Sequence, residues 1–168
     1  MQRKSFFKRI IGLALMVMAI LAAPSNAGAQ ANKLPPFRMV QSNGKIFKAE
    51  DLPMGKPILL IYFSPDCDHC EKMLKEFFGK AKQFSKSSVA MITYLTQDRV
   101  AKFEKDYPVK KHANIYAGTE GTTFFVRNYF KITDMPFAAL YTKEGNFVKS
   151  YSLEIPLNDL ATRLKTLQ

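Results

Sequence analysis

One continuous stretch, residues 58–84, constrains the fold more than any other part of the chain. It opens with six apolar or aromatic residues, Ile58 to Phe63, which predict a central strand buried on both faces, as in a parallel sheet. It ends with apolar residues at the spacing of one helix face: Leu74, Phe77, Phe78, Ala81 and Phe84. Between the two stands Cys67-Asp68-His69-Cys70. The pattern therefore places a CxxC motif where a strand passes into a helix.

The position of Cys67 at the start of the predicted helix favours a thiolate over a thiol. Backbone N–H groups that are left free there, and the positive end of the helix dipole, stabilise the anion. Cys70 lies one turn further in, close enough for a disulfide with Cys67 and more shielded. No other cysteine is present, and a CxxC at a strand-to-helix junction is typical of thioredoxin-type redox chemistry. Cys67 and Cys70 are therefore the candidate catalytic pair.

A structural disulfide and a zinc site are the weaker interpretations of the two cysteines. A disulfide that closes so short a loop would constrain the unfolded chain little. Zinc needs two further ligands, and the chain holds only two histidines, His69 and His112. On a helix, His69 would point about 160° away from Cys67 and about 100° away from Cys70. We expect neither a metal site nor a bound cofactor.

The first 29 residues have the features of a secretory signal. Basic residues between Arg3 and Arg9 precede an apolar run, Ile10 to Ala23, and an A-x-A sequence ends at Ala29. The run is short for a membrane-spanning helix, which needs about 20 residues, so a retained membrane anchor is the alternative. Cleavage after Ala29 would leave residues 30–168 as a single domain. In a Gram-negative cell its destination would be the oxidising periplasm.

The charge of the chain argues against a nucleic-acid partner. The net charge is +11, of which the first 29 residues contribute four, and the remaining lysines are scattered rather than clustered. Such a distribution is typical of a solvated surface, with attraction to anionic headgroups or acidic partners as the remaining possibility. We expect a monomer.

Beyond the central stretch, strands alternate with helices. An Asn43-Gly44 turn predicts an N-terminal β-hairpin, and Lys143–Asn146 predicts a second hairpin near the C-terminus. The expected strands cover residues 37–41, 45–48, 58–63, 89–95, 114–116, 137–142 and 147–152. Besides the helix after Cys67, the expected helices cover residues 97–107, residues 122–130 and a final segment opened by Pro156, with a loop over most of 109–123. This order predicts one α/β domain of three layers, a central mixed sheet flanked by helices.

With these elements in order, the chain resembles the thioredoxin superfamily, and more closely its exported TlpA/ResA-type branch of redoxin (AhpC/TSA-like) domains. The resemblance rests on GKPILLIYFSPDC before the CxxC helix, on NYFKITDMPFAALYTKEGNFV after it, and on a C-terminal helix. It covers essentially all of residues 30–168. It implies a thioredoxin-like fold. It also implies that Pro136 is cis and lies with Met135 beside Cys67, where the backbone of Met135 receives an extended substrate segment.

Three departures from the family pattern qualify the resemblance. Asp66 stands where thioredoxins carry a tryptophan before the first cysteine. Ile61 stands where they carry a buried acid, so Glu50, Glu71 or a water molecule becomes the candidate for moving protons to and from Cys70. The peroxidase pattern P-x-x-x-T-x-x-C does not match the residues before Cys67, which leaves a peroxiredoxin-like thiol peroxidase as a weak alternative.

The resemblance implies disulfide exchange with protein thiols and disulfides, with Cys67 as nucleophile and Cys70 as resolving cysteine. It favours a reductase fed by a membrane-embedded thiol donor. His69 resembles the histidine of strongly oxidising CxHC sites and favours the opposite direction, since an imidazolium there would favour the Cys67 thiolate while Asp68 would oppose it. A Cu(I)-binding metallochaperone of the Sco type is the alternative from another class, although Sco proteins use a CxxxC spacing and a distant histidine.

Overall fold

The computed structural model describes residues 32–168. The predicted signal segment, residues 1–29, and its cleavage site lie outside the described residues. Within the described part of the chain, no helix is long and apolar enough to cross a membrane.

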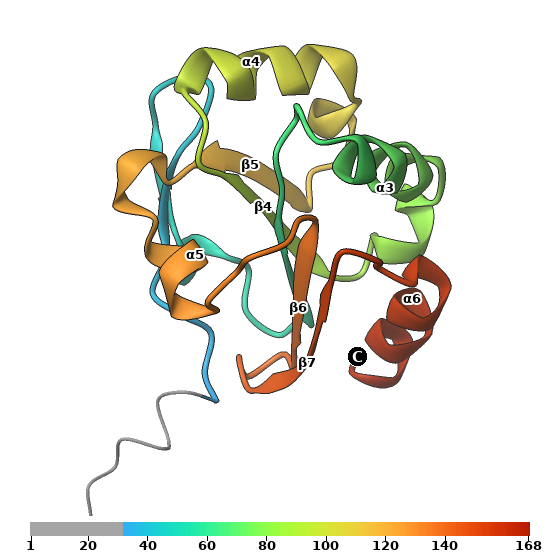
Figure 1. The fold of residues 1–168 in the computed structure, drawn as a ribbon. Helices are drawn as coiled ribbons and strands as arrows, with labels where there is room; N and C mark the ends of the chain where they lie inside the picture. The colour runs from blue at the N-terminus through green and yellow to red at the C-terminus, as the bar shows by residue number, and fades with distance from the viewer. Residues whose placement is uncertain (1–31) are drawn as a thin grey trace, which may run out of the picture. The chain divides into compact units, whose positions relative to one another are not determined.

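The described residues form one mixed sheet with helices on its faces (Figure 1). The strands are β1 (Arg38–Val40), β2 (Ile46–Lys48), β3 (Ile58–Tyr62), β4 (Ser88–Thr93), β5 (Ile115–Thr119), β6 (Phe137–Tyr141) and β7 (Phe147–Ser152). The α-helices are α3 (Asp68–Gly79), α4 (Gln97–Asp106), α5 (Phe125–Tyr129) and α6 (Leu157–Thr166). The strand order is β2-β1-β5-β4-β3-β6-β7, with β3, β4 and β5 parallel and the other pairs antiparallel.

Strand β3 is the centre of the sheet. It pairs with β4 in parallel, Leu60 opposite Ala90, and with β6 in antiparallel, Leu60 opposite Ala139. All five of its residues are buried, as its unbroken apolar sequence predicts. Its carboxyl end leads directly into the loop that carries the cysteines.

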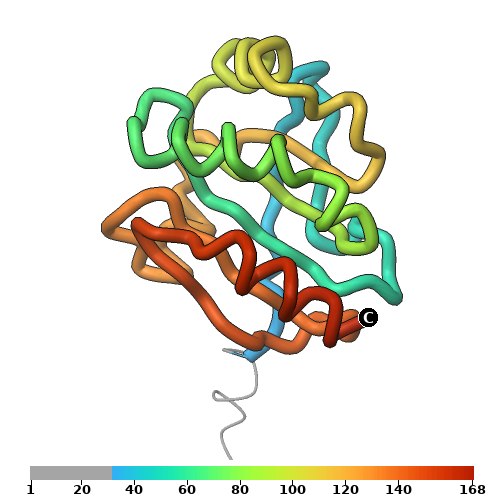
Figure 2. The backbone as a smooth tube through the Cα atoms, turned by 90° about the vertical axis from the view of Figure 1, so that its right-hand side faces the viewer, coloured from blue at the N-terminus to red at the C-terminus, as the bar shows by residue number. Residues whose placement is uncertain are grey.

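The side chains of β3 alternate between two apolar cores, one on each face of the sheet. On the first face, Leu59 and Ile61 pack beneath α3, α4 and α6; Figure 2 shows α3 and α6 lying next to each other there. On the second face, Ile58, Leu60 and Tyr62 pack against the N-terminal hairpin and α5. The predicted thioredoxin-like sandwich with an N-terminal hairpin is confirmed.

Three predicted elements differ from the structure. The helix after the cysteines ends at Gly79, and a 3-10 turn, Ala81–Phe84, then carries two of the predicted face residues into the core. The helix expected over residues 122–130 is only α5, because Phe124 adopts a left-handed φ of 46° that interrupts it. Strand β5 lies where a short strand over residues 114–116 is expected, but it extends to Thr119, into the segment expected as a loop.

Candidate active site at the start of helix α3

Cys67 lies at the N-terminus of α3, as the sequence predicts. It is the N-cap residue, and its Sγ accepts a hydrogen bond from the backbone N–H of Cys70 at 3.4 Å. Its thiol lies 3.6 Å from the carbonyl oxygen of Met135, to which it donates. The side chain is half-buried. Cys67 is therefore both reachable from solvent and in contact with a free helical N–H, which suits a thiolate nucleophile.

Cys70 is fully buried in the core beneath α3. Burial raises the pKa of its thiol to about 12, and the hydrogen bond with Cys67 acts in the same direction. Both cysteines are free thiols in this structure. The two sulfurs thus differ in environment, one half-exposed at a helix end and one shielded and protonated at neutral pH.

The loop before β6 brings Met135 and Pro136 against the cysteines from far along the sequence. The peptide bond between them is cis, as the resemblance implies. The carbonyl of Met135 faces Cys67, and the carbonyl of Pro136 accepts a hydrogen bond from the N–H of Leu153 at 2.9 Å. The backbone beside the thiol is therefore held on its other side by the residue that follows β7.

His69 and Asp68 are both exposed on the first turn of α3. Within residues 32–168, neither side chain makes a hydrogen bond or an ion pair. His69 lines a cavity of about 800 Å³ between α3 and the segment that joins β7 to α6. Any influence of these two residues on Cys67 therefore acts through charge rather than through a direct contact.

Asp66, the residue in the tryptophan position, forms an ion pair with Arg99 of α4. Its N–H also donates to the hydroxyl of Ser64, at 3.3 Å. The loop before Cys67 is thus tied to a second helix through a charged group. Sequence reasoning noted Asp66 but not Arg99, because no pattern connects positions 33 residues apart.

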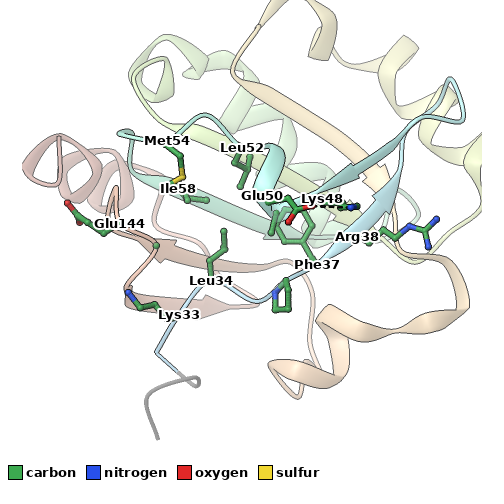
Figure 3. Close-up of a pocket in the computed structure, with 13 residues that line it drawn as sticks. Lys33, Leu34, Phe37, Arg38, Lys48, Glu50, Leu52, Met54, Ile58 and Glu144 are labelled. Atoms are coloured by element: carbon green, nitrogen blue, oxygen red, sulfur yellow. Dashed lines mark hydrogen bonds and ion pairs between the residues drawn. The ribbon is translucent and has the colours of Figure 1, made fainter. Parts of the chain in front are cut away.

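The structure separates Glu50, one of the suggested proton-transfer acids, from Cys70. Ile61 lies in the same core as Cys70, so the position where thioredoxins carry a buried acid is apolar here. Glu50 pairs with Lys48 and lines an apolar pocket of about 520 Å³ together with Ile58 (Figure 3). Ile58 begins β3, whereas the cysteines follow the other end of this strand. The sequence-based suggestion of Glu50 is therefore wrong.

Glu71 fits the proton-transfer role poorly as well. It follows Cys70 directly, but its side chain is exposed and forms an ion pair with Lys75 one turn further along α3. Burial and Glu71 together raise the pKa of Tyr107 nearby, with burial the larger cause. Of the three candidates for proton transfer to and from Cys70, water is the one that the described geometry does not argue against.

Sequence reasoning missed Glu120, an acid buried in the described domain. Only 6% of it is exposed, and its carboxylate accepts hydrogen bonds from the Tyr62 hydroxyl at 2.7 Å and from the N–H of Val126 at 2.6 Å. Burial and this carboxylate raise the pKa of Tyr62 far above its usual range. Glu120 thereby fixes the start of α5 against the end of β3. It follows β5 in the segment whose pattern gave the weakest signal.

The donor set for a Sco-type copper site is incomplete in the described chain. Within residues 32–168, no group of three or more His, Cys, Asp or Glu side chains is placed to hold a metal ion. His69 faces the cavity beside α3, and the ring of His112 lies 6.2 Å from that of Phe78. Neither histidine joins the two cysteines.

Comparison with known proteins places this geometry in a family. The AhpC/TSA family model matches residues 31–165. Three solved structures are similar over most of this chain. The first is dsbF of MTB, with a TM-score of 0.66 and 22% identity, over 79% of this chain and 96% of that one. The second is a secreted Mycobacterium tuberculosis disulfide oxidoreductase homologous to E. coli DsbE, with a TM-score of 0.64 and 16% identity, over 79% and 96%. The third is Bradyrhizobium japonicum ScoI with copper bound, with a TM-score of 0.58 and 18% identity, over 80% and 98%.

At these identities the solved structures show a shared fold and do not distinguish a disulfide oxidoreductase from a copper protein. No curated protein matches the sequence. The thioredoxin-like sandwich and the family match over nearly the whole described domain agree with each other. The chain therefore belongs to the AhpC/TSA family.

Proposed function

We propose that the protein is an exported thiol–disulfide oxidoreductase that acts on protein disulfides through Cys67 and Cys70. The observation that carries the proposal is the asymmetry of the two sulfurs. Cys67 is half-exposed at the N-terminus of α3, whereas Cys70 is buried 3 residues further on and holds its proton. An exposed nucleophile beside a shielded resolving thiol is the arrangement that two-step disulfide exchange needs.

In the first step, the Cys67 thiolate attacks one sulfur of a substrate disulfide. The substrate S–S bond breaks, one substrate thiolate leaves and takes a proton from water, and a mixed disulfide joins Cys67 to the other substrate sulfur. In the second step, Cys70 loses its proton and attacks the Sγ of Cys67, which releases the second substrate thiol. The substrate gains two electrons and two protons, and the protein is left with a Cys67–Cys70 disulfide.

We propose Met135 and Pro136 as the substrate-binding segment. The carbonyl of Met135 already lies beside Cys67, where an extended substrate backbone would meet it. The reductase direction rests on the resemblance to the TlpA/ResA-type branch, which also suggests a membrane-embedded thiol donor that restores the dithiol. The equilibrium constant of the pair against dithiothreitol tests the direction, since a strongly oxidising disulfide would favour the opposite role.

Trapping of the mixed disulfide tests the assignment of the two cysteines. Cys70→Ser leaves the nucleophile without a resolving thiol, so covalent complexes with partner proteins should accumulate and disappear on addition of dithiothreitol. Cys67→Ser should trap few or none, because the remaining thiol is buried and protonated. Both variants differ from the parent by one sulfur-to-oxygen change, which makes each the control for the other. Trapping mainly through Cys67→Ser would reverse the assignment.

Export is the second part of the proposal, supported by the signal-like sequence before Gln30. The mature protein should begin at Gln30, which intact mass of the protein isolated from its native host would establish. Recovery of the full-length chain in the membrane fraction would instead mean that the apolar run is retained as an anchor.

A further inference from the structure

Lysines that are scattered along the sequence lie together at one end of the described domain. Lys82, Lys86 and Lys165 line a common surface cavity of about 530 Å³ between the 3-10 turn after α3 and the last turn of α6, and no carboxylate side chain of the described residues lines it. All three residues are exposed, and within residues 32–168 none of their side chains makes an ion pair or a hydrogen bond. Their positive charges are therefore not paired with an acid.

The loop before β3 belongs to the same end of the domain. Ser88, the first residue of β4, binds this loop: its N–H donates to the carbonyl of Pro57 at 2.9 Å, and its hydroxyl donates to the carbonyl of Pro53 at 3.3 Å. The loop carries Lys56, which is exposed, and Met54, which is 76% exposed. A fourth lysine and an apolar side chain are therefore added to the first three lysines.

The turn between β6 and β7 and the start of the described chain lie at this end as well. Tyr141, which ends β6, is opposite Ile58, which begins β3, so the turn with Lys143 lies at the amino end of β3. Lys33 bridges to Asn146 of this turn, and its Nζ donates to the side-chain oxygen of Asn146 at 2.6 Å. We define the lysine end by six residues: Lys33, Lys56, Lys82, Lys86, Lys143 and Lys165.

The cysteines lie at the opposite end of the sheet, after the carboxyl end of β3. Helix α3 runs for 12 residues, about 18 Å, from Cys67 towards the lysine end, and Figure 2 shows α6 running beside it in the same direction. Charges of both signs lie near Cys67, where Asp66 pairs with Arg99. The lysine end holds the acid Glu144 too, but its six lysines leave an excess of positive charge.

We propose that the lysine end docks on the anionic headgroups of a membrane surface, and that the cysteines then face away from that membrane. Unpaired positive charge next to an exposed apolar side chain attaches a protein to the surface of an anionic bilayer. The chain before Lys33 joins the domain at this end, so a retained anchor would hold the same end against the membrane. The length of α3 exceeds the screening length of about 8 Å at physiological salt, so Cys67 would stay in bulk solvent. This proposal goes beyond the proposed function and does not depend on disulfide exchange.

Sedimentation with lipid vesicles tests the docking. Both apolar cores lie wholly within residues 37–164, so a chain of residues 30–168 contains all that the fold needs. We expect this chain to sediment with phosphatidylglycerol vesicles at about 50 mM salt and to be released at about 500 mM salt, because salt screens the attraction between the lysines and the headgroups. It should not sediment with uncharged phosphatidylcholine vesicles. Failure to bind the anionic vesicles, or equal binding to both kinds, would overturn the proposal.

Two triple variants of equal net charge separate the lysine end from the overall charge. Each lysine near an anionic surface strengthens binding roughly fivefold, so a variant without three of them should bind at least tenfold more weakly. This variant combines Lys82→Gln, Lys86→Gln and Lys165→Gln. The matched control replaces three other exposed lysines that make no ion pair within residues 32–168, and it should bind within threefold of the parent. It combines Lys45→Gln, Lys72→Gln and Lys131→Gln. Equal losses in the two variants would mean that net charge, and not the lysine end, attracts the vesicles.

Tryptophan probes and alkylation of Cys67 test the orientation. The chain contains no tryptophan, so Met54→Trp places a single reporter at the lysine end. Phe125→Trp places one at the start of α5, at a residue that is 40% exposed. Anionic vesicles should shift the emission of the first reporter to shorter wavelengths and leave that of the second unchanged. Alkylation of Cys67 by iodoacetamide, which is uncharged, should keep its rate within threefold when vesicles are bound.

Two results would overturn the orientation: an emission shift confined to Phe125→Trp, or a Cys67 that bound vesicles protect from alkylation. Neither result bears on disulfide exchange. Failure of the vesicle-free protein to react with any disulfide would instead count against the proposed function alone.

Discussion

The two faces of the central sheet differ in whether a carboxylate is buried in their cores. Neighbouring residues of β3 show the difference: Ile61 points to the first face, into the apolar core that also buries Cys70, whereas Tyr62 points to the second face and donates to the buried carboxylate of Glu120. The face that carries the two cysteines thus has an apolar side chain where thioredoxins carry an acid. The face without cysteines has the buried acid.

This difference indicates what each polar group does. Beneath α3, the apolar surroundings raise the pKa of Cys70, so that it is a thiol at neutral pH. On the second face, Glu120 fixes the start of α5, and α5 leads through residues 130–134 to Met135. Glu120 is therefore connected through the fold to the segment that we propose for substrate binding, whereas among residues 32–168 no buried carboxylate lies in the core around Cys70.

The largest effect is expected from Ile61→Asp, which places an acid in the core of the first face. The aspartate would replace a fully buried isoleucine and find no partner, so we expect the reduced protein to lose about 3–5 kcal/mol of unfolding free energy at pH 7. Urea denaturation measures the loss. Ile61→Val, which removes one methylene, is the control and should cost about 1 kcal/mol. Equal losses in the two variants would mean that the core beneath α3 tolerates charge.

The same variant should alter the pH dependence of the second step. In the parent, burial, the largest cause of the raised Cys70 pKa, persists in the mixed disulfide and should keep that pKa above the neutral range, so the thiolate fraction should rise about tenfold per pH unit and release of the substrate thiol should accelerate accordingly. A carboxylate at position 61 would accept that proton locally and flatten the profile. Stopped-flow measurement of release between pH 6 and 9 checks both slopes, and a flat profile in the parent would show that another base already acts there.

A smaller effect is expected from the second face, where Tyr62→Phe removes one donor to Glu120. We expect a loss of about 1.5–3 kcal/mol, since the hydrogen bond joins a buried carboxylate. The reaction of Cys67 with a small disulfide should stay within twofold of the parent, because the change lies across the sheet. Tyr141→Phe is the matched control: this tyrosine is equally buried, but its hydroxyl has no partner among the described residues, so its removal should cost little. Similar losses of unfolding free energy in the two variants would show that the hydrogen bond from Tyr62 to Glu120 does not stabilise the fold.

Sequence alone predicts the first face better than the second. The buried run of β3, the CxxC and the amphipathic spacing of α3 are local patterns, and the structure has them at the predicted places, except that α3 ends at Gly79 before the last two residues of the predicted face. Glu120 and Arg99 act through partners far along the chain, Tyr62 and Asp66, and no periodicity links such pairs. Leu153 escapes prediction for another reason: its local sequence gives no signal for the left-handed φ of 64° that it adopts.

The smallest effect is expected at His69, on the exposed side of the thiol pair. His69 makes no hydrogen bond to either cysteine among the described residues, so the influence that we propose for it is electrostatic and screened by solvent. His69→Ala should make the Cys67–Cys70 disulfide harder to reduce, because it removes a side chain that can carry positive charge beside the thiols. The shift should stay below the ~30 mV that corresponds to a tenfold change in equilibrium constant.

Two variants on the same helix give this prediction its controls. Asp68→Asn removes the opposing anion and should shift the equilibrium with dithiothreitol in the other direction, towards a disulfide that is easier to reduce. Lys72→Ala removes a charge one turn further from the helix start, at a residue that lines the same cavity as His69, and should have the smaller effect of the two cationic positions. The equilibrium constant with dithiothreitol, measured for each variant at one pH, reports these shifts. If His69→Ala changes this constant no more than Lys72→Ala does, then His69 is a solvated helix residue. The resemblance to oxidising CxHC sites would then carry no functional weight, and the apolar core around Cys70 together with the helix terminus at Cys67 would account for the tuning of the pair.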